Sequence, residues 1–267
     1  MKFIGSKFSS TKERNVEKRI LLYRWLNEFR YVEANVVANL LDVGLRQAQI
    51  FLKNLYTEGF IDSKKIAISL TKTSYIYFLT HKGYKQWVEI EPTKSEQKFR
   101  NQKRALNSSL LRHNIMVQDS VFNLMGLRSH ILREQFQIHG ESFFDDSYKG
   151  GRRPDAHISY KKGEQQINLV LEYEGVVKSS TRVQWILLQH LKQMLEGRYD
   201  IVYFYFSNES ARNIYERHFK AKNWPVINKV NYHYVLSKSH VKAWSYGDLS
   251  ERFYFKVSEF AKTTVIH

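Results

Sequence analysis

The sequence predicts an α/β protein in which a small helical region with a β-hairpin precedes a larger domain built on a mixed central sheet. Apolar residues recur at helical spacing in the first part, and short runs of β-branched and aromatic residues follow later in the chain. Only three prolines are present, and the polar stretch around Pro92 separates the two patterns. We therefore expect two domains, residues 1–91 and residues 92–267.

The composition narrows the class of protein. Hydrophobic residues make up 43% of the 267 residues, which is typical of a globular chain. Cysteine is absent, so disulfides and thiolate zinc sites are excluded. The formal net charge of +16 favours a polyanionic partner such as nucleic acid, with a basic surface kept for solubility as the alternative. No apolar run suits a signal peptide or membrane span, which predicts a cytoplasmic protein without membrane insertion.

Three helices are expected before the hairpin. The first ends near Phe29, the second opens at Glu33, and the third covers residues 45–60 after Gly44. A short helix, a glycine-containing turn and another helix form a helix-turn-helix. The residues expected to face inward are Val16, Ile20, Leu21, Tyr23 and Leu26 in the first helix, Val36, Val37, Leu40 and Leu41 in the second, and Leu45, Ala48, Phe51, Leu52 and Leu55 in the third.

The outward face of the third helix carries polar side chains suited to DNA. Arg and Gln can make bidentate contacts with guanine and adenine in the major groove. Residues 60–87 are expected to form the hairpin, with Lys64 and Lys65 near its start. This arrangement resembles winged-helix proteins over residues 12–90, and the alternative is a winged helix used for protein contacts. The expected DNA-binding residues are Arg46, Gln47, Gln49, Lys53, Lys64 and Lys65, with Asn54 on the same face.

The second part predicts the order helix, three strands, helix, strand. A further helix and a strand pair complete the domain. The expected elements are a helix over 104–126, strands over 130–138, 154–160 and 166–174, a helix over 181–197, a strand over 199–206, a helix over 209–219 and a strand pair over 226–237.

Three acids fall at specific points of this order. Asp155 begins the second strand, and Glu172 and Glu174 end the third on one face, because strand side chains alternate in direction. A turn at residues 163–164 would set Asp155 opposite Glu172, at about 5 Å. Three converging carboxylates need a cation or a proton, and oxygen ligands suit Mg²⁺ or Mn²⁺. The pattern predicts a metal site.

At these residues the sequence resembles the PD-(D/E)XK nuclease superfamily, whose restriction-endonuclease-like core has this element order. Asp155 matches the family's aspartate and Glu172 its second acid, whereas Glu174 stands where lysine is usual. Glu134, on the first strand, matches an additional acid often seen upstream. The resemblance implies that Asp155 and Glu172 hold the metal ion, with Glu174 completing its shell or holding the attacking water, and Glu134 a further ligand.

A lysine displaced from its usual position is expected to stabilise charge on the phosphate. Lys192, on the helix after the acids, is the first candidate, and Lys178 is the second. A surface lysine on an amphipathic helix is the alternative for Lys192.

The wider context, with RRPDAHI, INLVLEYEG and YDIVYFYFS after a winged helix, resembles the replication-relaxation proteins, and within them the MobC-type plasmid mobilization relaxases. The resemblance implies an endonuclease that nicks one strand of double-stranded DNA at a plasmid origin of transfer, with other mobilization proteins as further partners. In the alternative, Glu172 and Glu174 are solvent-facing acids at a strand end, and Asp155 is a turn residue after proline. The chain is then an accessory or replication-regulating protein that binds DNA through a degenerate nuclease fold without cutting it.

Overall fold

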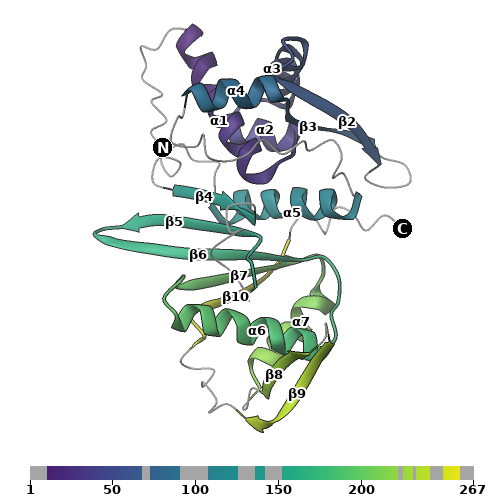
Figure 1. The fold of residues 1–267 in the computed structure, drawn as a ribbon, viewed down its shortest axis with the longest axis vertical. Coiled ribbons are helices and arrows are strands. Elements are labelled where there is room, and N and C mark those ends of the chain that lie inside the picture. Colours follow the sequence, from purple (N-terminus) through teal and green to yellow (C-terminus); the bar gives the residue numbers. More distant parts are fainter. Residues whose placement is uncertain are drawn as a thin grey trace. The chain divides into compact units, whose positions relative to one another are not determined.

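The computed structural model describes residues 11–67, 73–90, 108–125, 136–141, 152–221, 225–230, 233–240 and 249–258. The chain divides into two compact units, Met1–Ser142 and Phe143–His267, and each is described here by itself (Figure 1). The predicted boundary near Pro92 lies outside the described residues. None of the described helices is long and apolar enough to cross a membrane.

Helices form most of the first unit, and the three predicted from apolar spacing are present. Val36, Val37, Leu40 and Leu41 are buried as expected. In the third helix Leu45 is 44% exposed, against expectation, because it stands at the helix start, before the turn that packs inward. The helices of this unit are α1 Thr11–Phe29, α2 Ala34–Leu41, α3 Leu45–Thr57, α4 His81–Ile90 and α5 Ser108–Met125.

The tight turn between α2 and α3 depends on Asp42 more than on Gly44. Asp42 ends α2 with φ 51°, in the left-handed region, where its amide donates to the carbonyl oxygens of Ala38 and Asn39. Gly44 precedes α3 with φ −64°, which other residues adopt readily. The turn is therefore present where the sequence predicts it, but the unusual backbone conformation belongs to the aspartate.

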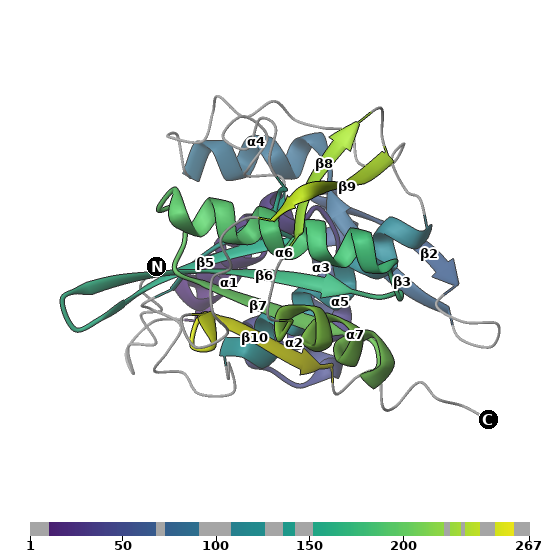
Figure 2. The same cartoon turned by 90° about the horizontal axis from the view of Figure 1, so that it is seen from below.

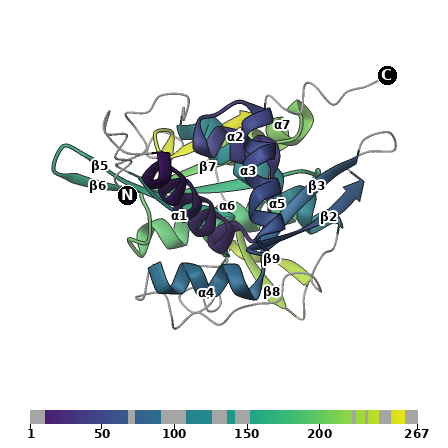
Figure 3. The same ribbon diagram turned by 90° about the horizontal axis from the view of Figure 1, so that it is seen from above.

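A three-stranded antiparallel sheet completes this region, with β1 Val32–Glu33, β2 Ile61–Ala67 and β3 Thr73–Leu79 in the order β1-β3-β2. The hairpin pairs Ile61 with Leu79 and Lys64 with Ile76. Helix α3 contacts β2, and Figure 3 shows the hairpin extending away from the helices. Ile76 is fully buried, whereas Tyr75, next to it, is 52% exposed, so the sheet has one apolar and one open face.

Residues 81–87, expected to continue the hairpin, instead lie in α4. The Thr80 hydroxyl accepts a hydrogen bond from the Gly83 amide at 3.1 Å and so caps the first turn of the helix. Trp87, in the second turn of the helix, is 1% exposed and shares the buried side of α4 with Gly83. Burial of the Trp87 side chain in the tertiary structure therefore stabilises helix α4.

Helix α5 and strand β4 Phe136–Gly140, assigned from sequence to the second domain, belong to the first compact unit. Helix α5 is joined to the first unit by the fully buried side chain of Gln118. Gln118 accepts a hydrogen bond from Trp25 Nε1 at 2.6 Å and donates one to the carbonyl oxygen of Tyr31 at 2.8 Å. Gly140 of β4 lies close to α1, with its amide 3.2 Å from Glu28 Oε2.

The second unit contains a mixed sheet, as predicted. Its strands are β5 Ala156–Lys162, β6 Gln165–Glu174, β7 Ile201–Phe206 and β10 Phe253–Val257, in the order β10-β7-β6-β5. Strand β5 is antiparallel to β6, and β6, β7 and β10 are parallel. The sequence did not predict β10, which lies beyond the last expected element.

Two helices pack on this sheet and form the core of the unit. α6 Ser180–Leu195 joins β6 to β7, and α7 Glu209–Phe219 follows β7, both in front of the strands in Figure 2. Apolar residues of both helices form one core with residues of β6, β7 and β10. A predicted strand pair is also present, as β8 Pro225–Val230 and β9 His233–His240, antiparallel to each other.

Candidate functional site

The β5–β6 hairpin positions the predicted acids. Its register runs from Lys162 opposite Gln165 to Ala156 opposite Leu171, so the paired residues end directly before Asp155 on one strand and Glu172 on the other. The Asp155 amide donates to the carbonyl oxygen of Leu171, the register partner of Ala156, at 3.1 Å, so the aspartate is held beside the end of β6 one residue off the regular register. The predicted turn at residues 163–164 sets this register, since a shift by one residue would reverse every side chain.

Asp155 is anchored to the backbone of the neighbouring strand. Its Oδ2 accepts a hydrogen bond from the Tyr173 amide at 2.7 Å. This bond fixes the direction of the carboxylate at the start of β5. The Oδ2 atom of Asp155 is therefore occupied by a hydrogen bond to the backbone of β6.

Glu172 and Glu174 share the face of β6 that α6 covers. Val170, two residues earlier on that face, lies in the core with side chains of α6. The two glutamates are 0% and 1% exposed. Their shared face was predicted from strand alternation, but their burial was not, because it depends on where the next helix packs.

Arg152 lies between the two buried glutamates. Its Nη2 donates to Glu172 Oε2, and the same nitrogen lies 3.2 Å from Glu174 Oε1. Lys178 Nζ donates to Glu174 Oε2, and His190 Nε2 is 3.2 Å from Glu172 Oε1. Each of the four glutamate oxygens thus has a nitrogen neighbour, and two cations face two carboxylates.

This arrangement shifts the ionisation of the buried groups. Burial alone would raise the pKa of Glu172, but the charge of Arg152 and the hydrogen bond from His190 outweigh it and lower the pKa to about 2. Burial disfavours the charged form of Arg152, yet Glu172, Glu174 and Asp155 together raise its pKa. Burial and the charge of Glu174 raise the pKa of the Tyr215 hydroxyl. The carboxylate of Glu172 is held ionised.

A closed chain of polar contacts ties this ion cluster to α6. Gln193 Nε2 donates to the Arg152 carbonyl oxygen at 2.8 Å, and Tyr199 donates its hydroxyl proton to Gln193 Oε1 at 2.7 Å. The Tyr199 oxygen lies 2.7 Å from His190 Nδ1, which must therefore supply the proton of that bond. The remaining ring nitrogen, Nε2, faces Glu172 Oε1 at 3.2 Å, which closes the chain of polar contacts at the carboxylate.

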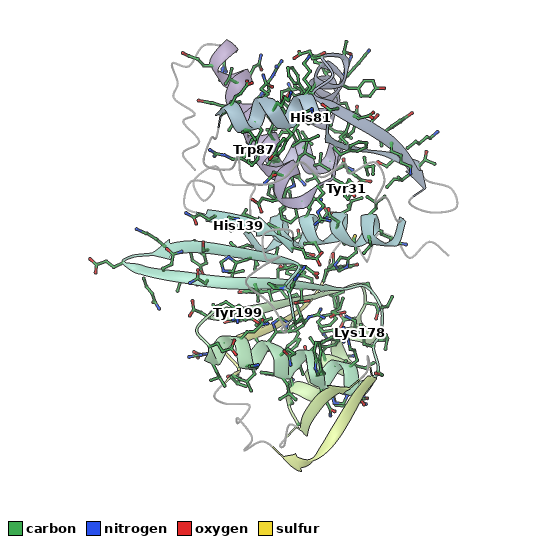
Figure 4. The ribbon with its side chains drawn as sticks, in the orientation of Figure 1. Tyr31, His81, Trp87, His139, Lys178 and Tyr199 are labelled. Atoms are coloured by element: carbon green, nitrogen blue, oxygen red, sulfur yellow. The ribbon has the colours of Figure 1, made fainter. Side chains whose placement is uncertain are left out.

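The two candidate lysines are placed very differently. Lys192 is 68% exposed and lies 3.7 Å from Glu196, on the outer side of α6 and away from the acids. Lys178 precedes α6 and binds Glu174 directly; Figure 4 labels it together with Tyr199, which follows the helix. The structure therefore brings the second candidate to the acids and does not bring the first.

The expected Mg²⁺ or Mn²⁺ site does not fit this arrangement of donors. Glu134, a proposed ligand, lies outside the described residues. Within the described parts of the chain, no group of three or more His, Cys, Asp or Glu side chains is placed to hold a metal ion. Arg152 takes the place between Glu172 and Glu174 that a cation would need, and Asp155 has one oxygen committed to the sheet.

Sequence reasoning missed Arg152 and His190. Arg152 stands in RRPDAHI, directly before the predicted strand, where a charged residue near a proline is an ordinary loop feature. His190 carried a clearer signal, since it recurs with Val183, Ile186 and Leu187 on the buried stripe of α6. A polar residue on an apolar stripe indicates a buried partner.

A second candidate site is the exposed face of α3 and the β2 strand. The six residues predicted to bind DNA are all exposed, four on α3 and two on β2. Phe51, expected inward, is partly buried. These six residues are Arg46, Gln47, Gln49 and Lys53 on α3, and Lys64 and Lys65 on β2.

Comparisons with known proteins place the chain in one family. No curated protein matches it. The structure of restriction endonuclease FokI shows a weak likeness, at 11% identity and a TM-score of 0.23, over 74% of this chain and 38% of FokI. The structure of FokI bound to DNA shows a similar likeness, at 13% identity and a TM-score of 0.21, over 74% of this chain and 39% of FokI. The chain thus spans about two fifths of FokI, and these scores are too low to assign a fold. The Replication-relaxation family model matches residues 23–184, more than half of the chain, which therefore belongs to the Replication-relaxation family.

Proposed function

We propose that this protein binds double-stranded DNA through its first unit, with α3 in the major groove and the β2–β3 hairpin as a wing on the backbone. The order of α1, β1, α2, α3, β2 and β3, with the sheet order β1-β3-β2, supports this proposal, because it sets a hairpin directly after the third helix of a helical unit. The net charge of +16 supplies attraction to the phosphates.

The observation that carries this proposal is the chemistry of the exposed α3 face. Arg46 and Gln49 are exposed, and both side-chain types form bidentate contacts with base edges. Lys64 and Lys65 on β2 are exposed as well, and ammonium groups suit phosphates. One helix face therefore offers base readout, and the strand beside it offers sequence-independent affinity.

The test compares specific and random duplexes. Duplexes selected from a random-sequence pool by the wild-type protein serve as specific probes. Arg46→Ala should weaken binding to the selected duplex by about 1–3 kcal/mol more than binding to random DNA. An equal loss on both kinds of duplex would remove α3 from the role of reading sequence. Leu195→Ala, a change at an exposed residue of the second unit, is the matched control.

Strand cleavage at the acid cluster, as in a transfer-origin relaxase of the MobC type, is the second candidate. The observation that favours it is the gathering of Asp155, Glu172, Glu174 and Lys178, four groups of the nuclease pattern. Against it stands Arg152, which pairs with both glutamates. The geometry therefore supports binding without cleavage better.

A plasmid relaxation assay separates the two candidates. Supercoiled plasmid carrying the selected sequence is incubated with the protein and Mg²⁺ or Mn²⁺. Binding alone leaves the plasmid supercoiled. Metal-dependent nicking that disappears in Glu172→Gln and Asp155→Ala, while both variants still bind the duplex, would establish cleavage and return the acids to a catalytic role.

A further inference from the structure

Ile50 stands at the centre of the exposed face of α3. Its side chain is 52% exposed, although isoleucine is among the residues most often buried. Arg46, Ile50 and Lys53 follow the spacing i, i+4, i+7, so they share one line along the helix. The buried residues of α3, on its other side, are Ala48, Leu52 and Leu55.

A single exposed aliphatic side chain on a protein surface needs no explanation. Ile50 differs because of its neighbours, Arg46 one turn before it and Lys53 about one turn after it. Two cations on the same line suit a polyanion, and the middle of a helix held in a groove loses its water. An aliphatic group at that point is favourable only if it meets another apolar group.

Double-stranded DNA offers one such group in the major groove. Guanine, cytosine and adenine present only hydrogen-bonding edges there, whereas thymine also presents its C5-methyl group. We propose that Ile50 contacts the C5-methyl group of a thymine, so that α3 selects a T·A pair at that position. This inference rests on the proposed DNA binding. Arg46 and Lys53, on either side, then contact the flanking bases or phosphates.

The contact between Ile50 and the thymine methyl group is small. Burial of one methyl-sized group contributes enough to change affinity by about fourfold. Loss of either partner, the isoleucine side chain or the thymine methyl, should remove the same contribution. The two losses together should cost no more than either one, because they break a single contact.

Uracil isolates the methyl group, since it pairs with adenine as thymine does and lacks only that group. The selected duplex is synthesised with deoxyuridine replacing thymidine at one position at a time, and affinities are measured by fluorescence anisotropy. At one position uracil should weaken wild-type binding by about fourfold. Ile50→Ala should bind the thymine and uracil duplexes equally, at about the wild-type affinity for uracil.

Val16→Ala is the matched control: Val16, an aliphatic residue of α1, was expected to face inward, but its side chain is 48% exposed. It should keep the wild-type preference for thymine. Thermal unfolding of Ile50→Ala should match the wild type, since an exposed side chain contributes little to the core. This comparison shows that any change in affinity is local.

Two outcomes overturn the inference without touching the proposed function. In the first, the wild-type protein binds its selected duplex specifically, but uracil at each thymine position leaves its affinity unchanged. The protein then makes no contact with a thymine methyl group. An Ile50→Ala variant that keeps the uracil penalty shows that another residue reads the methyl group. By contrast, failure of the wild-type protein to select any duplex would refute the DNA-binding proposal itself.

Discussion

Glu172 and Glu174 are buried as ions because nitrogen groups surround all four of their oxygens. Arg152 contacts both carboxylates, and Lys178 and His190 contact one each. A buried pair of this kind contributes little net stability relative to apolar residues, but removing one partner leaves an uncompensated charge. Arg152 is therefore the residue on which the local structure depends most.

Arg152→Ala should lower the free energy of unfolding by about 3–5 kcal/mol, since Glu174 then keeps only Lys178 and Glu172 keeps only His190. Urea denaturation followed by circular dichroism measures the change. Lys192→Ala is the control: it removes an exposed partner of Glu196, and surface pairs contribute at most about 1 kcal/mol. Similar losses in both variants would show that Arg152 is not a buried counterion.

The low pKa of Glu172 predicts a dependence of stability on acid. Its pKa falls from 4.5 to about 2 on folding, because Arg152 and His190 outweigh the cost of burial. A depressed pKa means that the ionised group stabilises the folded state above about 4.5, and that this contribution is lost as the pH falls toward about 2.

Glu172→Gln should lack this contribution at every pH. The difference in unfolding free energy between wild type and variant should therefore shrink steadily between about 4.5 and about 2. Equilibrium urea unfolding across that range provides the measurement. A constant difference would mean that Glu172 is not an ionised partner of Arg152.

Helix α4 shows how packing overrides a local pattern. Residues 81–87 were expected to continue the hairpin after β3, yet they form a helix capped by Thr80. The helix lies close to the chain at Phe60, and a Cβ built on Gly83 would be 2.0 Å from the Phe60 carbonyl oxygen. Only glycine allows this approach between α4 and the start of the hairpin.

Gly83→Ala should therefore destabilise the protein by about 1–3 kcal/mol or more, because a backbone atom would have to move. Gly44→Ala is the matched control, since its Cβ would meet nothing within 4 Å and its φ is −64°. Thermal unfolding compares the two variants. An unchanged melting temperature in Gly83→Ala would contradict the close packing of α4.

For the whole molecule, the dominant physical property is the net charge of +16. Charge of this size acts through counterion release, so binding to any duplex should weaken steeply as salt rises. Under the proposed function, the α3 side chains decide which sequence is preferred, whereas lysines such as Lys64 and Lys65 set the salt dependence.

Lys64→Ala and Lys65→Ala should each reduce the slope of log affinity against log salt by about 0.9, equally on selected and random duplexes. Anisotropy titrations over a range of potassium chloride concentrations give the slope. Lys192→Ala removes the same charge from an exposed site of the second unit and should leave the slope unchanged. A smaller slope in Lys192→Ala would instead place DNA contacts on the second unit.

The secondary structure of this protein follows largely from local pattern. The helical spacing of Val36, Val37, Leu40 and Leu41 correctly placed α2, and the turn at residues 163–164 correctly joined the β5 and β6 strands. Such predictions succeed because they depend on the period of the backbone. Helix α4 was missed although its buried residues, Gly83 and Trp87, have helical spacing, because residues 81–87 were assigned to the hairpin. Strand β10 was missed because it lies beyond the last expected element, and its pairing with the distant strand β7 depends on the fold.

The sequence by itself determined the order of the elements and the shared face of the acids, since both depend on residues close together along the chain. Only the tertiary structure decided which cation meets those acids. Arg152 lies 20 residues before Glu172, and His190 approaches it only because α6 packs across that face of β6. The same packing of α6 on β6 exposes the Lys192 side chain to solvent. Charge compensation in a buried site is a property of distant residues brought together, which the spacing of side chains along one strand does not reveal.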